Sequence, residues 1–86
     1  MKQYITEEFD PRDGVVYVTT YSVSAKSAHG KGLPMPVGIM PKDILSIHTD
    51  NECAYARYDS ETDQIRVSVV LGRELTEQLT VTMVWI

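Results

Sequence analysis

Apolar and polar residues alternate with a period of two along most of the chain, which is the pattern of half-buried β-strands. The clearest run is residues 15–24, where Val15, Tyr17, Thr19, Tyr21 and Val23 occupy one set of alternate positions. β-Branched and aromatic residues dominate this run, and such residues favour strands over helices. The sequence therefore predicts a long strand with one face more aromatic than the other.

The same alternation predicts five further strands, separated by residues that favour turns. The segment from Asp10 to Gly14 fixes φ at Pro11 and offers Gly14 for a positive φ. Residues 49–52 and 59–63 are polar breaks of hairpin length, and residues 72–78 are long enough for one helical turn. The five strands are expected over residues 3–8, 44–48, 53–58, 65–69 and 79–86.

Short strands at regular spacing are typical of sandwiches and small barrels. We therefore expect an all-β fold, a compact antiparallel β-sandwich or small barrel of about 6–7 strands. Residues 1–86 are expected to form a single β domain, because a chain of 86 residues has room for one small core. Residues 2–9 are expected to be either an edge strand of that domain or an arm.

Residues 25–41 interrupt the alternation, because glycines and prolines recur through them and forbid a regular central strand. A loop of this length inside a small domain is often functional. Residues 25–42 also carry Lys26, Lys31 and Lys42 without any acid, whereas the rest of the chain holds five basic and twelve acidic side chains. We expect residues 25–41 to form a long Gly/Pro loop, exposed as a contact arm.

Composition and charge exclude several classes of protein. A chain with 43% hydrophobic and 23% charged residues is expected to fold. Its net charge of −4 argues against binding to nucleic acid or to an anionic membrane, and no apolar run approaches the ~20 residues that span a bilayer. Cys53 is the single cysteine, so no internal disulfide can form, and the start of the chain lacks the apolar core of a signal peptide. Synthesis in a cytoplasm is expected.

Three short patterns resemble ligand-binding motifs, but each lacks residues that the motif requires. Residues 28–32 resemble a glycine-rich anion loop, but neither a Lys-Ser/Thr pair nor a helix follows. Asp59, Glu61 and Asp63 match the first calcium ligands of an EF-hand, whose required glycine and glutamate are missing further on. His29, His48 and Cys53 have no short zinc-binding spacing, and Cys53 is expected to be a small buried hydrophobe. We expect no catalytic, cofactor-binding or metal-binding residues.

Five tyrosines are many for this length and could form a stacking platform for a sugar. Packing in the core and on sheet faces, with the phenolic tips reaching water, is the simpler interpretation. The tyrosines are Tyr4, Tyr17, Tyr21, Tyr55 and Tyr58.

The last predicted strand ends on Val84, Trp85 and Ile86 with no polar tail. Chain ends usually fray, so such an ending is expected to be held in a sheet, a core or a partner's surface. Val81, Met83 and Trp85 alternate with less apolar residues and are expected to face a core. Together with the Gly/Pro loop, this ending supplies the candidate partner-binding residues, which are Lys26, His29, Lys31, Leu33, Met35, Trp85 and Ile86.

Four segments of the second half of the chain resemble small virion proteins of tailed bacteriophages. They are Leu33-Pro34, the run from Pro41 to Ile47, the run from Tyr58 to Val67, and the closing strand from Val81 to Val84, within about residues 33–86. The resemblance implies an all-β domain without enzymatic activity that binds a capsid or tail lattice, as head decoration and other accessory proteins do.

We therefore expect a nonenzymatic structural component of a larger assembly, most simply a bacteriophage capsid decoration or cement protein. Its partner would be a protein lattice such as a major capsid or tail protein, and it would be a homo-oligomer or lattice-bound, located in the virion and otherwise cytoplasmic. The alternative is a small acidic inhibitor or binding module that occupies a basic surface of a partner protein. A tyrosine-based sugar-binding domain is a third interpretation, and no catalytic constellation favours an enzyme.

Overall fold

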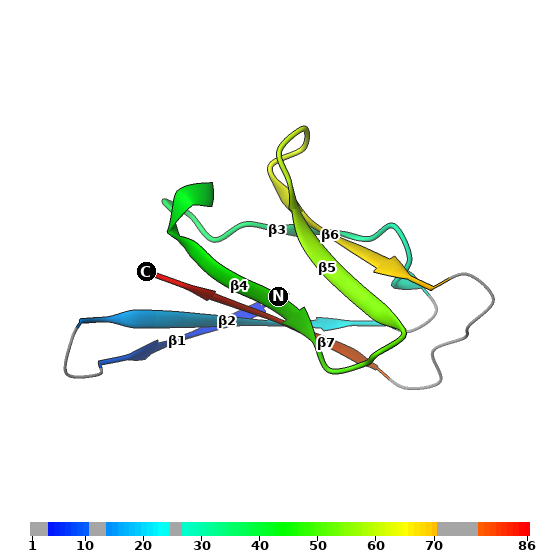
Figure 1. Cartoon of the computed structure of the whole chain (residues 1–86), viewed down its shortest axis with the longest axis horizontal. Helices are drawn as coiled ribbons and strands as arrows, with labels where there is room; N and C mark the ends of the chain where they lie inside the picture. Colours follow the sequence, from blue (N-terminus) through cyan, green and yellow to red (C-terminus); the bar gives the residue numbers. More distant parts are fainter. Residues whose placement is uncertain (1–3, 11–13, 25–26, 71–77) are drawn as a thin grey trace.

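The computed structural model describes residues 4–10, 14–24, 27–70 and 78–86, and these residues form an antiparallel β-sandwich of two sheets (Figure 1). The expected all-β fold is confirmed. A 3-10 turn over Pro41–Asp43 precedes the fourth strand. The strands are β1 (Tyr4–Phe9), β2 (Val16–Val23), β3 (Gly32–Pro34), β4 (Ile44–Thr49), β5 (Ala54–Asp59), β6 (Gln64–Val69) and β7 (Leu79–Trp85).

The strands are divided between a four-stranded and a three-stranded sheet. Sheet A has the order β1-β2-β7-β4 and sheet B the order β3-β6-β5, with every neighbouring pair antiparallel. The chain therefore crosses between the sheets after β2, β3, β4 and β6. As a result β7 lies in the middle of sheet A, where Trp85 is opposite Tyr17 of β2 and Ile44 of β4.

The core lies between the two sheets and is built from one face of each strand. Because side chains alternate between faces along a strand, the buried residues of β7 are every second one, Leu79, Val81 and Met83. Trp85 continues this face and is half-buried, which confirms the expectation that the alternate positions of the last strand face a core. The remaining buried apolar residues are Tyr21, Val23, Ala28, Leu33, Ala54, Ile65 and Val67.

The Gly/Pro segment departs from the sequence-based expectation. Residues 32–34 form the edge strand β3, in which Leu33 is opposite Ile65 of β6 and only 1% exposed. Ala28 and Pro36 are buried as well. Proline and glycine exclude a central strand, but a short edge strand tolerates them because one of its sides needs no ladder bonds. Residues 32–36 therefore belong to the sandwich and are not an exposed arm, whereas residues 27, 29–31, 37, 38, 40 and 41 are exposed, as expected for a Gly/Pro loop.

Tyr21 ties this segment to sheet A. Its hydroxyl donates a hydrogen bond of 2.7 Å to the carbonyl oxygen of Pro34, and its ring lies 5.3 Å from that of Tyr4. Burial raises the pKa of the Tyr21 hydroxyl far above its ordinary value, with a smaller contribution from Tyr4. The hydroxyl therefore stays protonated, and its bond joins β2 of sheet A to Pro34 of sheet B.

The N-terminal segment is an edge strand. Residues of β1 pair with β2 from Tyr4 opposite Tyr21 to Phe9 opposite Val16, so the described part of this segment belongs to the domain. The helical turn expected at residues 72–78 lies outside the described residues except for Gln78.

The hairpin between β5 and β6 is held by charged side chains at its tip. The Asp59 carboxylate accepts a hydrogen bond from the backbone N–H of Glu61 at 3.0 Å and pairs with the Arg66 guanidinium at 3.2 Å. The Glu61 N–H, followed by Arg66 and Thr62, holds the pKa of Asp59 below its ordinary value of 3.8.

This lowered pKa predicts a loss of stability in acid. The folded state binds the Asp59 proton more weakly than the unfolded state does, so the contribution is present above about pH 4 and is lost as the pH falls through the folded-state pKa. Asp59→Asn should flatten the pH dependence of the melting temperature below pH 4, with Glu61→Gln as the control that keeps it. An unchanged profile in Asp59→Asn would contradict this role.

Candidate interaction surfaces

The described residues offer little for metal or catalytic chemistry. They contain no group of three or more His, Cys, Asp or Glu side chains placed to hold a metal ion. His48 is exposed on β4, and Cys53 is half-buried, so Cys53 is not the fully buried hydrophobe that was expected. His29 accepts a hydrogen bond at Nδ1 from the backbone N–H of Val69, at 3.0 Å. No helix in the described ranges is long and apolar enough to cross a membrane.

The tyrosines do not share one surface. Tyr17 stacks on Trp85 with ring centroids 4.4 Å apart, and Tyr4 packs on buried Tyr21. Tyr58 donates its hydroxyl hydrogen to Asp63 at 2.6 Å. Tyr55 is the one that exposes more than half of its surface. The described arrangement therefore supports packing for most of these rings and gives no stacking platform.

The outer face of sheet A carries an apolar surface at the end where β7 terminates. Phe9 of β1 is opposite Val16 of β2, and Val18 is opposite Val84 of β7. Ile86 follows Trp85, which faces inward, so the alternation places Ile86 outward beside Val84. We call the set of Phe9, Val16, Val18, Leu45, Val84 and Ile86 the apolar patch.

The patch is open to solvent. Phe9, Leu45 and Ile86 expose 49%, 57% and 54% of their surfaces, and Val16, Val18 and Val84 are half-buried. Leu45 joins the patch because of a β-bulge or similar irregularity, since the register of β4 against β7 shifts between Ile44 and Ser46. A bulge of this kind redirects a side chain. An outer sheet face that meets only water is normally polar, so this one has the character of a covered surface.

Along the two central strands the other half of the same face is polar, whereas Ile5 of β1, opposite Thr20, is an apolar side chain that is 69% exposed. There the outward positions of the central strands are held by Thr20 and Ser22 of β2 and by Thr80 and Thr82 of β7, and His48 extends the row onto β4. On the two central strands, the outward apolar residues are therefore clustered at the end where β7 terminates. Scattered apolar residues are common on surfaces, whereas a contiguous patch is characteristic of contact sites.

The predicted partner-binding residues separate into different places. Leu33 is in the core, Met35 packs against it, and Trp85 faces inward and donates its Nε1 hydrogen to Thr19 Oγ1 at 2.8 Å. His29 and Lys31 are exposed near β6, and Lys26 lies outside the described residues. Only Ile86 of the predicted set belongs to the apolar patch. The predicted set lacks Phe9, Val16, Val18, Leu45 and Val84. Residues 15–18 and 83–86 are apolar at every position, so both faces of these strand ends are apolar, and this was the signal in the sequence.

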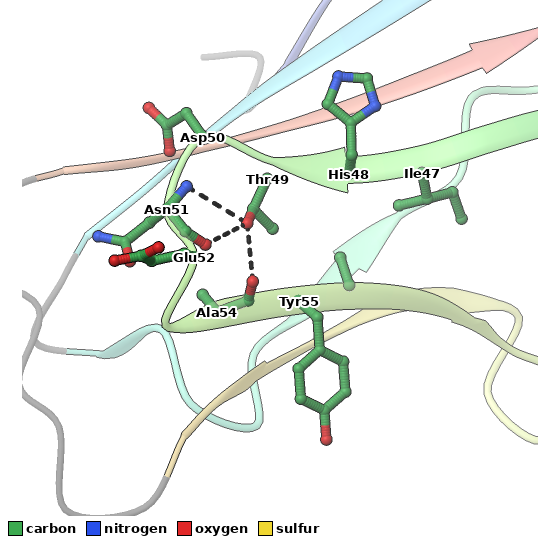
Figure 2. A pocket seen from close by; sticks show the side chains of 9 residues that line it. Ile47, His48, Thr49, Asp50, Asn51, Glu52, Ala54 and Tyr55 are labelled. Carbon is green, nitrogen blue, oxygen red and sulfur yellow. Dashed lines mark hydrogen bonds between the residues drawn. The ribbon is translucent and has the colours of Figure 1, made fainter.

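A second surface is the open groove between β4 and β5, shown in Figure 2, with a volume of about 490 Å³. Thr49 shapes its closed end, since its hydroxyl lies 2.8 Å from the carbonyl oxygens of both Asn51 and Ala54. His48 and Tyr55 point in opposite directions from the two strands. The lining residues are Ile47, His48, Thr49, Asp50, Asn51, Glu52, Ala54, Tyr55 and Ala56.

Comparison with known proteins adds no relative. No protein-family model, curated protein or solved structure matches this chain. The fold places the protein among the small antiparallel β-sandwiches, a class that includes many functions, so its surfaces carry the information about function.

Proposed function

We propose that this protein is a nonenzymatic structural component of a larger protein assembly and that it docks through the apolar patch. The patch is the observation that carries the proposal, because it spans all four strands of sheet A and leaves three large side chains about half exposed. Covering these side chains removes apolar surface from water, which stabilises a complex by roughly 25 cal/mol for each Å². The most economical occupant is a protein surface of similar character.

A repeating lattice is the assembly that suits such a surface. A patch of six residues is smaller than the roughly 20–30 residues a side of a standard stable interface, so one contact of this size is weak. Many copies on a lattice gain from multivalency when each also touches its neighbours. Together with the resemblance of residues 33–86 to phage accessory proteins, this favours a virion decoration or accessory role on a capsid or tail lattice.

An acidic inhibitor would present its negative charge on one surface. The described acids instead lie in separate places, which are residues 7–10, Asp43 in the 3-10 turn, the turn at residues 50–52 and the hairpin tip at residues 59–63. Several are engaged within the domain, since Asp59 pairs with Arg66 and Asp50 accepts a hydrogen bond from the N–H of Thr80. Because the acidic side chains are dispersed in this way, the described surface does not favour an acidic inhibitor.

The proposal predicts that patch substitutions release the protein from its assembly without unfolding it. Leu45→Ser with Ile86→Ser should move the chain of 9.7 kDa from the particle fractions of a sucrose gradient, run on a lysate of the cells that make it, to the top of the gradient. Circular dichroism should show an unchanged fold, because exposed substitutions usually cost less than about 0.5 kcal/mol.

The matched control is Val37→Ser with Val70→Ser, which removes two exposed apolar side chains outside the patch and should leave the gradient profile unchanged. A wild-type chain that stays at the top of the gradient would refute the assembly role. Equal effects of the two double variants would refute docking through the patch.

A further inference from the structure

Glu7 lies within the apolar patch of sheet A. It is directly opposite Val18 in the register of β1 and β2, and Val18 is opposite Val84 of β7. Because directly opposite residues of an antiparallel pair share one face of the sheet, the Glu7 side chain is on the same outer face as these two valines. On that face Phe9 is its neighbour along β1, and Val16 is its diagonal neighbour on β2. The patch therefore has a carboxylate among its apolar side chains.

Glu7 is the one fully charged side chain on this face of the described strands. The outward positions of β1, β2, β7 and β4 otherwise hold aliphatic or aromatic residues, threonine, serine and His48. Glu7 is exposed, and the one ion pair among the described residues joins Arg66 to Asp59 on sheet B. The Glu7 carboxylate thus has no ion-pair partner within the described part of the domain.

The charges around this face place Glu7 in an acidic region. Glu8 is in β1 and Asp10 directly follows the strand, and both are exposed. Lys42 lies in the 3-10 turn before β4, next to Asp43 and at the opposite edge of sheet A. The strands β1 and β4 are three strand spacings apart, roughly 14 Å, which exceeds the ~8 Å screening length of physiological salt. A cation that approaches the β1 side of the patch is therefore attracted.

The remaining cations of the described chain lie elsewhere. They belong to sheet B or adjoin it, across the core from the outer face of sheet A, and they are Lys31, Arg57 and Arg66. The protein as a whole is acidic, with a net charge of −4. Neither the near nor the distant charges therefore oppose a positively charged partner at Glu7.

Docking through the patch removes water from Glu7. An ionised carboxylate that loses its water without gaining a partner weakens a complex, so a wholly apolar surface is penalised beside β1. A surface that carries phosphate groups, such as nucleic acid or an anionic membrane, repels the carboxylate. A protein surface that combines apolar side chains with a cation matches both the patch and Glu7.

We propose that the partner surface covering the apolar patch belongs to a protein that places a lysine or arginine side chain against Glu7. This inference rests on the proposed function, since it requires docking through the patch, and it adds the chemistry of the partner. The apolar side chains supply affinity, whereas the ion pair fixes the orientation of docking and disfavours partners without the cation. An arginine could donate to both carboxylate oxygens of Glu7.

The test compares Glu7→Gln with Glu8→Gln in the sucrose gradient that follows the wild-type chain into particle fractions. Glutamine keeps the shape of glutamate and removes its charge, so the partner's cation is left unpaired. We expect Glu7→Gln to lower the ratio of particle-bound to free chain at least tenfold, because removing one member of a desolvated charge pair is costly. A partner surface without the cation gives the opposite sign, since Glu7→Gln then relieves the desolvation of a carboxylate and raises the ratio.

Glu8→Gln is the matched control. Glu8 is the next residue of β1 and is opposite Tyr17, so it lies on the other face of the same strand, and its substitution changes the net charge equally. It should leave the ratio of bound to free chain within about twofold. Circular dichroism of both purified variants should show the wild-type fold, because both positions are exposed.

The outcomes separate this inference from the proposed function. If Leu45→Ser with Ile86→Ser releases the chain while Glu7→Gln binds as well as the wild type or better, the inference is overturned and docking through the patch stands. If that double variant stays in the particle fractions, docking through the patch is refuted and the inference with it.

Two further results would overturn the inference alone. Equal losses in Glu7→Gln and Glu8→Gln would show that the carboxylates act only through net charge or by protecting the edge of β1. A dimer of the purified wild-type chain in sedimentation equilibrium that Leu45→Ser with Ile86→Ser abolishes would identify a second copy of this chain as the occupant.

Discussion

Leu33→Ala is expected to lower the free energy of unfolding by about 2–5 kcal/mol, the usual cost of truncating a fully buried leucine. Leu33 is 1% exposed and opposite Ile65, which is itself completely buried, so the alanine leaves a cavity between the two sheets. A domain of this size has only about 4–13 kcal/mol of stability. Chemical denaturation monitored by circular dichroism gives the difference directly.

The control comes from the same segment. Val37 is 99% exposed, and Val37→Ala should change the free energy of unfolding by less than about 0.5 kcal/mol. A contact arm laid on the surface would make the two variants equally mild. A small effect of Leu33→Ala would therefore contradict the placement of β3 in the sandwich.

Trp85→Ala is expected to cost about 2–4 kcal/mol, somewhat less than the ~3–5 kcal/mol of a fully buried aromatic residue. The substitution removes the stack on Tyr17 and leaves Thr19 Oγ1 without the indole donor at 2.8 Å. Thr19 is completely buried, and its hydroxyl also lies 2.9 Å from that of Thr6. The side chains of Trp85, Thr19 and Thr6 thus form a row of hydrogen bonds on the inner face of sheet A, and Trp85 stabilises the folded domain.

Two further variants separate the contributions of this end of β7. Trp85→Phe keeps an aromatic ring on Tyr17 but loses the hydrogen bond, so it should cost about 1–3 kcal/mol. Ile86→Ala should leave stability within about 1 kcal/mol, because the side chain is 54% exposed. If Ile86→Ala destabilises the domain as much as Trp85→Ala does, the assignment of Ile86 to an outer surface is wrong.

The alternation of apolar and polar residues was enough to predict six of the seven strands. It failed for β3, which is too short to show an alternation and contains residues that favour turns. The strand predicted at residues 15–24 is β2 (Val16–Val23), and the last predicted strand is β7 (Leu79–Trp85). β3 was missed because its residues, Gly32, Leu33 and Pro34, have the composition of a turn. Its pairing with β6 is decided by the burial of Leu33 against Ile65, which no local pattern reports.

The interaction surfaces were less predictable for a different reason. Val18 and Val84 become neighbours only when β2 and β7 pair, and nothing in the chain reveals that pairing before folding. The ion pair between Arg66 and Asp59 likewise depends on the register in which β5 pairs with β6. The alternation in a sequence predicts on which face of its strand a residue lies. Which residues of distant strands become neighbours can be predicted only when the order of strands in the sheet is known.

The central place of β7 in sheet A has a kinetic consequence. β2 and β4 do not pair with each other, so sheet A cannot close until the last strand enters between them, and the Trp85–Thr19 bond joins residues 66 positions apart. Such high contact order places folding in the range of about milliseconds to seconds, and unpaired β2 and β4 edges are exposed to intermolecular pairing until then. Production of this protein at high concentration should therefore be limited by aggregation of chains in which β7 has not yet paired, and it should improve on cooling.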